Sequence, residues 1–278
     1  MQLRGRNVVL TGASHGIGPH IADTLAKCGA NLLLAARSAA ELAGVAERAR
    51  QCGVKAVAIP TDVALSDQRL ALIERTQAEL GPIDVLVNNA AVETVSPFDT
   101  VSPAQLEREV AVNLLAPMAL TRLALPGMLE RGSGHVVNIS SLAGLVAPSH
   151  AEGYAATKSG LIAFTRSLRR EYRGRGIGFS VVCPGFVAEG MWTRHANRGV
   201  RAPLLVGVVE VEKVTDAVVS AIVEGRSELV VTPRPMRPLL AVAALSPSFA
   251  DWMYRFSGAA DLYREMRTVP AVARVPKP

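Results

Sequence analysis

The stretch NVVLTGASHGIG, residues 7–18, decides the fold. An apolar run ends at Thr11, and glycines at positions 12, 16 and 18 follow it before a helical pattern begins. Glycine lets the backbone turn sharply and approach a ligand closely, and a helix N-terminus presents free N–H groups to an anion. Because this loop follows a strand and opens the first helix, we interpret it as a pyrophosphate-binding loop of a nucleotide site, in preference to a simple tight turn.

Short apolar runs of the same kind recur along the chain. They are typical of strands buried on both faces, and therefore of a parallel sheet covered by helices. Helical stretches separate them, including 66–82, which opens with Ser66 as a cap, and two long stretches at about 102–131 and 153–175. The alternation predicts an α/β fold with a Rossmann-type, doubly wound parallel sheet of about seven strands. The predicted strands fall within 7–12, 31–36, 55–62, 83–90, 134–141, 178–185 and 228–233.

The chain is long enough to bury one large core. Its 278 residues are 49% hydrophobic and only 19% charged, which excludes a disordered chain. The character of the sequence changes after residue 233, where a stretch rich in proline and alanine begins. We therefore predict one domain at 1–233 and a C-terminal helical extension at 234–278.

Charge and cysteine content limit the possible partners and compartments. The net charge of +6 comes from scattered arginines without the dense runs of a nucleic-acid arm, so no nucleic-acid partner is expected. Cys28, Cys52 and Cys183 follow no disulfide or ligand spacing, so we expect reduced thiols and no metal site. We see no signal peptide before the first strand and no apolar run of the roughly 18 residues that a membrane span needs. A cytoplasmic location is expected.

Further motifs stand in order after the later strands. They are Asp62-Val63, NNAA at 88–91, Asn113, ISS at 139–141, Tyr154 with Lys158, and Pro184-Gly185. With the spacing T-G-x-x-x-G-x-G of the first loop, the chain resembles the short-chain dehydrogenase/reductase family over about residues 5–232. The resemblance implies an oxidoreductase that transfers a hydride between a nicotinamide and a carbonyl or secondary alcohol.

The resemblance implies four catalytic residues: Asn113, Ser141, Tyr154 and Lys158. The pKa of a free tyrosine, about 10, is too high for efficient proton exchange near neutrality. Lys158 lies one helical turn beyond Tyr154 on the same face, and we expect its charge to lower that pKa. Ser141 lies thirteen residues before Tyr154, the usual separation in the family, and would hydrogen-bond the substrate oxygen. Strand alternation points the neighbouring Ser140 to the opposite face.

Pro117 follows Asn113 by four residues. Proline has no N–H and clashes with the carbonyl four residues earlier, so the helix should kink and leave the Asn113 carbonyl without its helical partner. In family members this carbonyl holds a water that links to the lysine. A proline that only bends a long surface helix is the alternative.

The end of the second predicted strand indicates the cofactor. NAD-preferring enzymes place an acid about 20 residues past the glycines, and this chain has Ala36 followed by Arg37. Arginine can hold a 2′-phosphate bidentately, so we predict NADP(H), although Arg37 could also be a solvated surface residue. The resemblance adds Ser14 and His15 beside that phosphate. The other cofactor residues that it implies are Gly12, Gly16, Ile17, Gly18, Asp62, Val63, Asn89, Ala90, Tyr154, Lys158, Pro184, Gly185 and Val187.

The chain departs from the family pattern after Pro184-Gly185. PGFVAE places Glu189 where the family often has a threonine that bonds the nicotinamide amide, so side-chain help at this position is in doubt. We expect the following residues, 190–207, to form a flap over the substrate. Met191 and Trp192 either line an apolar pocket or pack on the core.

Two functional classes remain open. One is an enzyme acting on a small-molecule carbonyl or alcohol, such as a lipophilic ketone, aldehyde or acyl derivative; the other is a catalytically silent protein that senses nucleotides or binds partners. The complete Ser–Tyr–Lys set favours the enzyme.

The helix from Tyr154 onward carries apolar residues over too much of its circumference for one buried stripe, which predicts a homodimer or homotetramer.

The C-terminal extension contains an amphipathic segment. Phe249, Trp252, Met253 and Phe256 recur at three- and four-residue spacing, which predicts a helix with one apolar face. That face could pack on its own subunit, close a partner's pocket, or make a weak membrane-surface contact. Arginines 234, 237, 255 and 264 would suit the third possibility.

Overall fold

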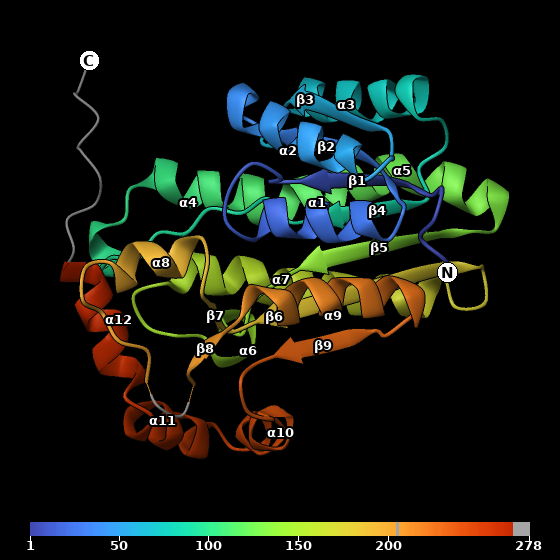
Figure 1. The fold of residues 1–278 in the computed structure, drawn as a ribbon. Coiled ribbons are helices and arrows are strands. Elements are labelled where there is room, and N and C mark those ends of the chain that lie inside the picture. Colours follow the sequence, from blue (N-terminus) through green and yellow to red (C-terminus); the bar gives the residue numbers. More distant parts are fainter. Residues whose placement is uncertain (204–205, 269–278) are drawn as a thin grey trace.

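A seven-stranded parallel sheet forms the centre of the protein (Figure 1). The computed structural model describes residues 1–203 and 206–268. The strand order is β3-β2-β1-β4-β5-β6-β9, so the chain runs outward from β1 and then returns across it to β4. The predicted doubly wound α/β fold is confirmed. The strands are β1 (Asn7–Thr11), β2 (Asn31–Ala36), β3 (Ala56–Pro60), β4 (Val85–Asn88), β5 (Gly134–Ile139), β6 (Ile177–Pro184) and β9 (Glu228–Val231).

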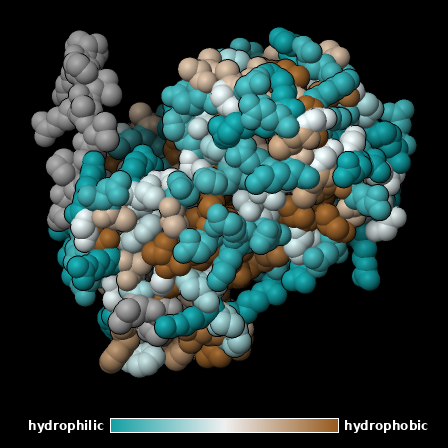
Figure 2. Space-filling model, viewed as in Figure 1, coloured by the Kyte–Doolittle hydropathy of each residue, from teal (hydrophilic) through white to brown (hydrophobic). Residues whose placement is uncertain are grey.

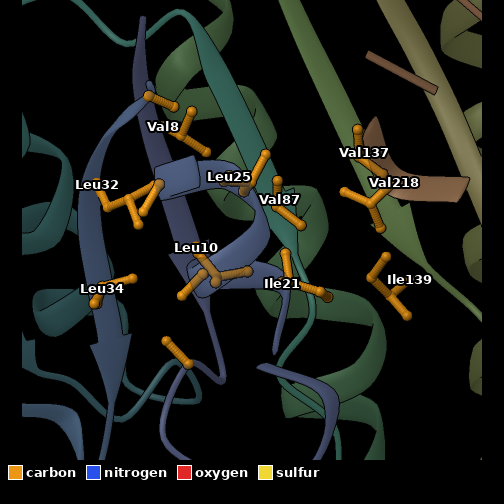
Figure 3. Close-up of a cluster of buried hydrophobic side chains, with 14 of the residues drawn as sticks. Val8, Leu10, Ile21, Leu25, Leu32, Leu34, Val87, Val137, Ile139 and Val218 are labelled. Carbon is orange, nitrogen blue, oxygen red and sulfur yellow. The ribbon is translucent and has the colours of Figure 1, made fainter. Parts of the chain in front are cut away.

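Helices cover both faces of this sheet. On one face lie α1 (Ile17–Lys27), α2 (Ala39–Gln51) and α9 (Val211–Val223). On the other lie α3 (Ser66–Glu79), α5 (Ala116–Arg131) and α7 (Glu152–Glu171). Strand alternation supplies both layers, since Leu10 packs toward α1 while its neighbour Val9 packs toward α3 and α5. Figure 3 shows the first layer, with Val8, Leu10, Ile21, Leu25, Leu32, Leu34, Val87, Val137, Ile139 and Val218 packed together.

The predicted helix at about 102–131 has three parts. The first is α4 (Pro103–Val110), which begins with a capping box between Ser102 and Gln105. The middle part is a π-helical turn over Ala111–Leu115, closed by the Ala116 N–H bonding to the Ala111 carbonyl, and α5 follows. The turn precedes Pro117 directly, so the predicted irregularity near Asn113 takes the form of a π-helical turn.

This same helix corrects one expectation about membranes. Pro103–Arg131 is long and apolar enough to cross a bilayer by length and composition alone. However, Val112, Leu120 and Met128 lie in the core layer beneath the sheet. We therefore regard it as the core helix of a globular domain.

The start of α3 differs from the prediction by one residue. Ser66 is the first helical residue, and Leu65 occupies the cap with extended backbone angles and no side-chain cap bond. Asp62 organises the preceding turn, because its Oδ1 accepts a hydrogen bond from the Ala64 N–H at 3.0 Å. This Asx-type turn brings the chain into the helix one residue earlier than a Ser66 cap would.

Several short elements surround the carboxyl ends of the strands. A small sheet pairs β7 (Phe186–Val187) with β8 (Val208–Val209), and the predicted flap contains α8 (Met191–Ala196). The other short helices are η1 (Phe98–Thr100) and α6 (Ala143–Val146). None of these short elements was predicted individually, because each depends on contacts with distant parts of the chain.

Over residues 234–268, the part that the structure describes, the C-terminal extension forms three helices: α10 (Arg237–Leu245), α11 (Pro247–Phe256) and α12 (Ala259–Thr268). The predicted amphipathic helix is α11, but only part of its apolar face is covered: Phe249 and Met253 are half-buried, whereas Trp252 is 48% exposed and Phe256 72%. The packing residues are instead those of α12. Leu262, Tyr263 and Met266 are buried in a cluster with Trp192 and Tyr154.

Candidate active site

A cavity of about 860 Å³ opens at the carboxyl ends of β1, β4, β5 and β6. In a doubly wound sheet this edge is where ligands bind, and the volume suits a large organic ligand. The cavity brings together nearly all the predicted site residues. Its lining includes Gly12, Ser14, His15, Gly16, Ile17, Arg37, Asp62, Val63, Asn89, Ala90, Ser141, Tyr154, Lys158, Pro184, Gly185 and Val187. Gly18 and Asn113 lie outside that lining.

The glycine loop has the features of an anion cradle. A side chain at Gly12 would place its Cβ 2.7 Å from the Ala90 Cα, so only glycine fits there. Gly18 packs in the same way against the Gly12 carbonyl, which seats α1 on the loop. The N-terminus of α1 has no side-chain cap bond and no acidic residue in its first turn, so its N–H groups face the cavity without a competing anion.

Hydrogen bonds from Asn89 hold the ends of β1 and β4 together. Its Nδ2 donates to the carbonyl oxygens of Thr11 and Gly12, both at 3.0 Å. The Thr11 hydroxyl in turn accepts from the backbone N–H groups of Asn89 and Ala90 at 3.0 and 3.1 Å. The Asn89 side chain therefore fixes the shape of the glycine loop from below.

The far end of the cavity beside β2 is basic. Arg37 is exposed at the end of β2, and Ser14 Oγ lies 2.8 Å from His15 Nδ1 in the loop next to it. Asp62 is engaged with Arg108, whose guanidinium lies 3.0 Å from the carboxylate. Burial raises the pKa of Asp62, but the Ala64 N–H and the Arg108 charge outweigh it and leave the pKa lowered. With that carboxylate paired, Arg37 gives this end a positive charge suited to an anionic group.

Ser141, Tyr154 and Lys158 meet in the middle of the cavity. Lys158 is almost completely buried on α7, and its Nζ donates to the Ile139 carbonyl at 2.8 Å and lies 5.6 Å from the centre of the Tyr154 ring. The Ser141 side chain is near enough to the Tyr154 hydroxyl to lower its pKa. The Ser140 hydroxyl instead donates to the Lys158 carbonyl at 2.8 Å, buried against α7. The spacing argument that selected Ser141 over Ser140 thus agrees with the geometry.

The charges in this centre correct one expectation. Burial raises the pKa of Tyr154, the charge of Glu93 adds to the rise, and the nearby Ser141 side chain only partly offsets it. Lys158 does not bring the pKa below that of a free tyrosine, because its own ammonium is buried and its pKa falls to about 8. Near neutrality the Tyr154 hydroxyl therefore keeps its proton.

Asn113 lies behind the cavity and not in its wall. It is fully buried in the π-helical turn, and its Nδ2 donates to the Val92 carbonyl at 2.8 Å and to the Thr157 hydroxyl at 3.2 Å. Its Oδ1 accepts from the Val92 N–H at 2.8 Å. The side chain therefore ties the segment after β4 to α7. Its partner on α7 is Thr157, which lies between Tyr154 and Lys158 in the sequence.

Glu93 is a site residue that the sequence reasoning missed. It lines the cavity next to the NNAA motif and interacts electrostatically with Tyr154, Lys158 and Arg194 of the flap. Burial, together with the nearby Glu109, raises its pKa to about 7. An acidic residue directly after a predicted buried strand, at the edge where parallel strands end, was the signal available in the sequence.

Glu189, the departure from the family pattern, lines the cavity and interacts with the first helix. Its carboxylate lies 3.8 Å from His20 Nε2 of α1, so it connects the base of the flap to the first helix. Next to it, Gly190 sits directly on the glycine loop, because a Cβ at Gly16 would lie 3.2 Å from the Gly190 Cα. The flap thus begins in contact with the glycine loop.

The flap and the tail make the apolar wall of the cavity. Trp192 both lines the cavity and packs on the core, with its ring centre 4.6 Å from that of Phe186, so the two expectations for this residue hold together. Met191 lines the cavity as well. Tyr263 and Met266 of α12 complete this side, with the Tyr263 ring 6.2 Å from Phe186.

The arrangement fits a nicotinamide dinucleotide. Positions where a Cβ would collide line the loop, and the first helix offers uncapped N–H groups for a pyrophosphate. A neutral tyrosine and a serine stand together at the other end, where the apolar wall begins. Within residues 1–203 and 206–268, no three His, Cys, Asp or Glu side chains come together as metal ligands.

Comparisons with known proteins agree with this geometry. The family model of short chain dehydrogenases matches residues 6–198. The chain is 42% identical to the ketoacyl reductase HetN of Nostoc sp. over 264 residues, which is 93% of this chain and 91% of that protein. It is 35% identical to the 3-oxoacyl-[acyl-carrier-protein] reductase FabG of Staphylococcus aureus over 187 residues, 67% of this chain and 76% of that protein.

Solved structures show the same fold. A short-chain oxidoreductase of metagenomic origin, crystallised in complex with NADP, has a TM-score of 0.71 and 32% identity, and the match covers 84% of this chain and 100% of that one. A short-chain alcohol dehydrogenase from Sinorhizobium meliloti has a TM-score of 0.72 and 28% identity, with 82% and 94% covered.

The charge of Glu93 generates a prediction about pH. Above pH 7 Glu93 is ionised, and its negative charge disfavours loss of the Tyr154 proton. Glu93→Gln removes that charge, so the pKa values of Tyr154 and Lys158 should both fall and the alkaline limb of a pH–rate profile should move to lower pH. The matched control is Glu152→Gln, at the exposed start of α7, the helix that carries Tyr154. It should leave the pH–rate profile unchanged. Equal profiles for Glu93→Gln and the control would show that Glu93 does not act on Tyr154.

Proposed function

This chain belongs to the short-chain dehydrogenase family, and on that premise we propose that it is an NADP(H)-dependent reductase of lipophilic ketones, with 3-oxoacyl derivatives as the favoured class. The observation that carries the proposal is the apolar wall of flap and tail side chains beside Ser141 and Tyr154. A lipophilic chain against that wall would place its carbonyl at the two hydroxyl groups.

The residues of the centre have distinct tasks in this reaction. The nicotinamide, when bound, supplies the hydride. The Tyr154 hydroxyl gives its proton to the carbonyl oxygen, and the Ser141 hydroxyl hydrogen-bonds that oxygen as negative charge develops. Lys158 stabilises the tyrosinate left behind, and Asn113 positions α7 through Thr157.

The choice of NADP(H) is supported by the charge at the end of β2. Ala36 leaves no carboxylate to repel a 2′-phosphate, and Arg37 lines the cavity with Ser14 and His15 beside it. A guanidinium can bond a phosphate through two N–H groups. A relative of the same fold binds NADP in its crystals.

The substrate class is supported by the relatives and by the tail. HetN and FabG are reductases of ketoacyl compounds by name. The match to HetN covers 93% of this chain. The part left uncovered is shorter than residues 234–278, so the match extends into the C-terminal extension. Tyr263 and Met266 of that extension form part of the cavity wall. A shared tail that lines the site favours a related substrate.

We also propose a cytoplasmic location. Cys52 is exposed and Cys28 partly exposed, whereas Cys183 is buried and its pKa is raised to about 12 by burial. Exposed thiols persist in a reducing compartment. Fractionation of cells into cytoplasmic, periplasmic and membrane portions tests this location.

Turnover of a carbonyl panel tests the function. NADPH oxidation should be fastest with 3-oxoacyl thioesters of increasing chain length, and Tyr154→Phe should lower kcat by about 10²–10⁴-fold, because general acid catalysis contributes on that order. NADPH should still bind to Tyr154→Phe, since only the hydroxyl is lost. The neighbouring Ser140→Ala is the control for Ser141→Ala, which should impair turnover more. NADPH binding without turnover of any carbonyl would replace the enzyme by a nucleotide-sensing protein.

Arg37 tests the cofactor. Hydrogen bonds to charged groups contribute about 1.5–3 kcal/mol, so Arg37→Ala should weaken NADPH binding by roughly ten- to a hundredfold. NADH lacks the 2′-phosphate, and its binding should hardly change. Fluorescence titration with both cofactors makes the comparison. Equal losses for the two would mean that Arg37 supports the fold and does not read the phosphate.

We propose a homodimer or homotetramer built on the outer face of α4, the π-helical turn and α5. Val110, Leu115 and Met118 are large apolar residues exposed on this face, at 47%, 49% and 38%. Burying them against a second copy would remove them from water. Light scattering at micromolar concentration should give a multiple of the 29.3 kDa chain mass, and Leu115→Arg should lower it. A monomer in the unmodified protein would contradict this proposal.

A further inference from the structure

Helices α10 and α11 carry an apolar surface that no described part of the subunit covers. Neither helix contains a buried residue. The sequence of α10, RPLLAVAAL, is apolar around its whole circumference after the first turn. A helix of that composition is normally enclosed by protein or lipid.

The exposed side chains are large and lie on both helices. Leu239, Val242 and Leu245 of α10 are 39%, 50% and 87% exposed, and Trp252 and Phe256 of α11 are 48% and 72% exposed. Figure 2 shows brown side chains at the lower edge of the molecule, where Figure 1 places these two helices. We call these five residues the tail ridge.

The tail ridge is held firmly from its other side. The Ser149 N–H donates to the Tyr254 hydroxyl of α11 at 3.0 Å, and the Ser149 hydroxyl lies 2.9 Å from it. On the ridge itself the Trp252 ring contacts Phe249 and Phe256, with centroid distances of 5.7 and 4.7 Å. The exposed aromatic residues therefore belong to an ordered surface whose opposite side docks on the subunit.

The charge around the tail ridge has one sign over a long stretch. Between Glu228 and Asp251 the chain contains no acidic residue, while Arg234 and Arg237 precede α10 and begin it. Arg255 stands between Trp252 and Phe256 in the sequence of α11, with Asp251 as the acidic residue of that helix. Arginines beside exposed aromatic and aliphatic side chains match an anionic lipid surface, which attracts basic residues and accepts apolar ones.

The shape of the tail ridge separates a membrane from a second copy of the chain. Protein interfaces have closely complementary surfaces, and a residue at the core of such an interface sits in a pocket. Leu245 and Phe256, at 87% and 72% exposure, protrude from the ends of their helices. A protruding apolar corner fits a deformable medium. We propose that the tail ridge docks on the surface of an anionic lipid bilayer, with its apolar residues inserted at the headgroup level.

This placement has a consequence for the cavity. Tyr254 of α11 and Tyr263 of α12 line the cavity, while Trp252 and Phe256 of the same segment lie on the tail ridge. A docked protein would hold the apolar wall of its site near the bilayer. Delivery of a lipid-dissolved carbonyl compound to that site rests on the proposed function, whereas the docking itself does not.

Vesicle binding by the full chain tests the docking without any substrate. We expect co-sedimentation with vesicles of phosphatidylcholine and phosphatidylglycerol, weaker binding in high salt, and little binding to pure phosphatidylcholine. The double variant Leu245→Glu with Phe256→Glu should bind at least about tenfold more weakly, because each buried apolar side chain contributes that much or more. The matched control is Leu65→Glu with Leu70→Glu, which are 46% and 47% exposed near α3, and it should bind like the unmodified protein.

Tryptophan fluorescence gives an independent readout. The chain has two tryptophans, of which Trp192 is buried and Trp252 lies on the tail ridge. In Trp192→Phe the emission of Trp252 should shift to the blue on adding anionic vesicles, and brominated lipids should quench it. The proposal is overturned by an unshifted Trp252, or by equal vesicle binding of the ridge variant and its control. It is also overturned if the ridge variant only lowers the mass by light scattering, since a second copy then covers the ridge.

Discussion

The close contact between the ends of β1 and β4 sets the geometry of the whole site. The chain leaves β1 toward one edge of the sheet and returns to β4 on its other side, so the loops after these strands diverge and leave a crevice. Asn89 and Thr11 tie the two ends together with hydrogen bonds of 3.0–3.1 Å, and the missing side chain of Gly12 lets Ala90 approach. The anion cradle takes its shape from this contact.

The second constraint is the burial of charge beside Tyr154. Lys158 carries its ammonium almost out of contact with water, and its one described hydrogen bond joins the neutral Ile139 carbonyl. Burial of an ammonium is costly unless a negative group compensates it, which is why its pKa falls to about 8. Glu93 is near enough to favour the charged lysine and to disfavour a charged tyrosine. The centre is thus balanced to keep the tyrosine proton until a ligand alters the local charge.

The sequence predicted best those features whose cause is local. Apolar runs such as the one before Thr11 mark buried strands because both faces of a parallel strand must be covered. Alternation along β5 separated Ser140 from Ser141 for the same reason. The sequence did not predict the role of Glu93 or the contact between His20 and Glu189. Each depends on which segments meet at the carboxyl edge of the sheet. The roles assigned to the four catalytic residues and to the cofactor residues stay predictions until turnover and binding are measured.

The tail shows why amphipathic patterns alone did not decide its packing. The aromatic spacing of α11 predicted an apolar face correctly, but the subunit uses α12 and Tyr254 for its contacts and leaves Trp252 and Phe256 outside. A helix with more apolar surface than one partner can cover needs a second partner. Cavity wall and tail ridge therefore lie on different sides of one short helical unit. Leu245 and Phe256 do not line the cavity. Substitutions on the tail ridge can therefore alter docking without altering the shape of the substrate site.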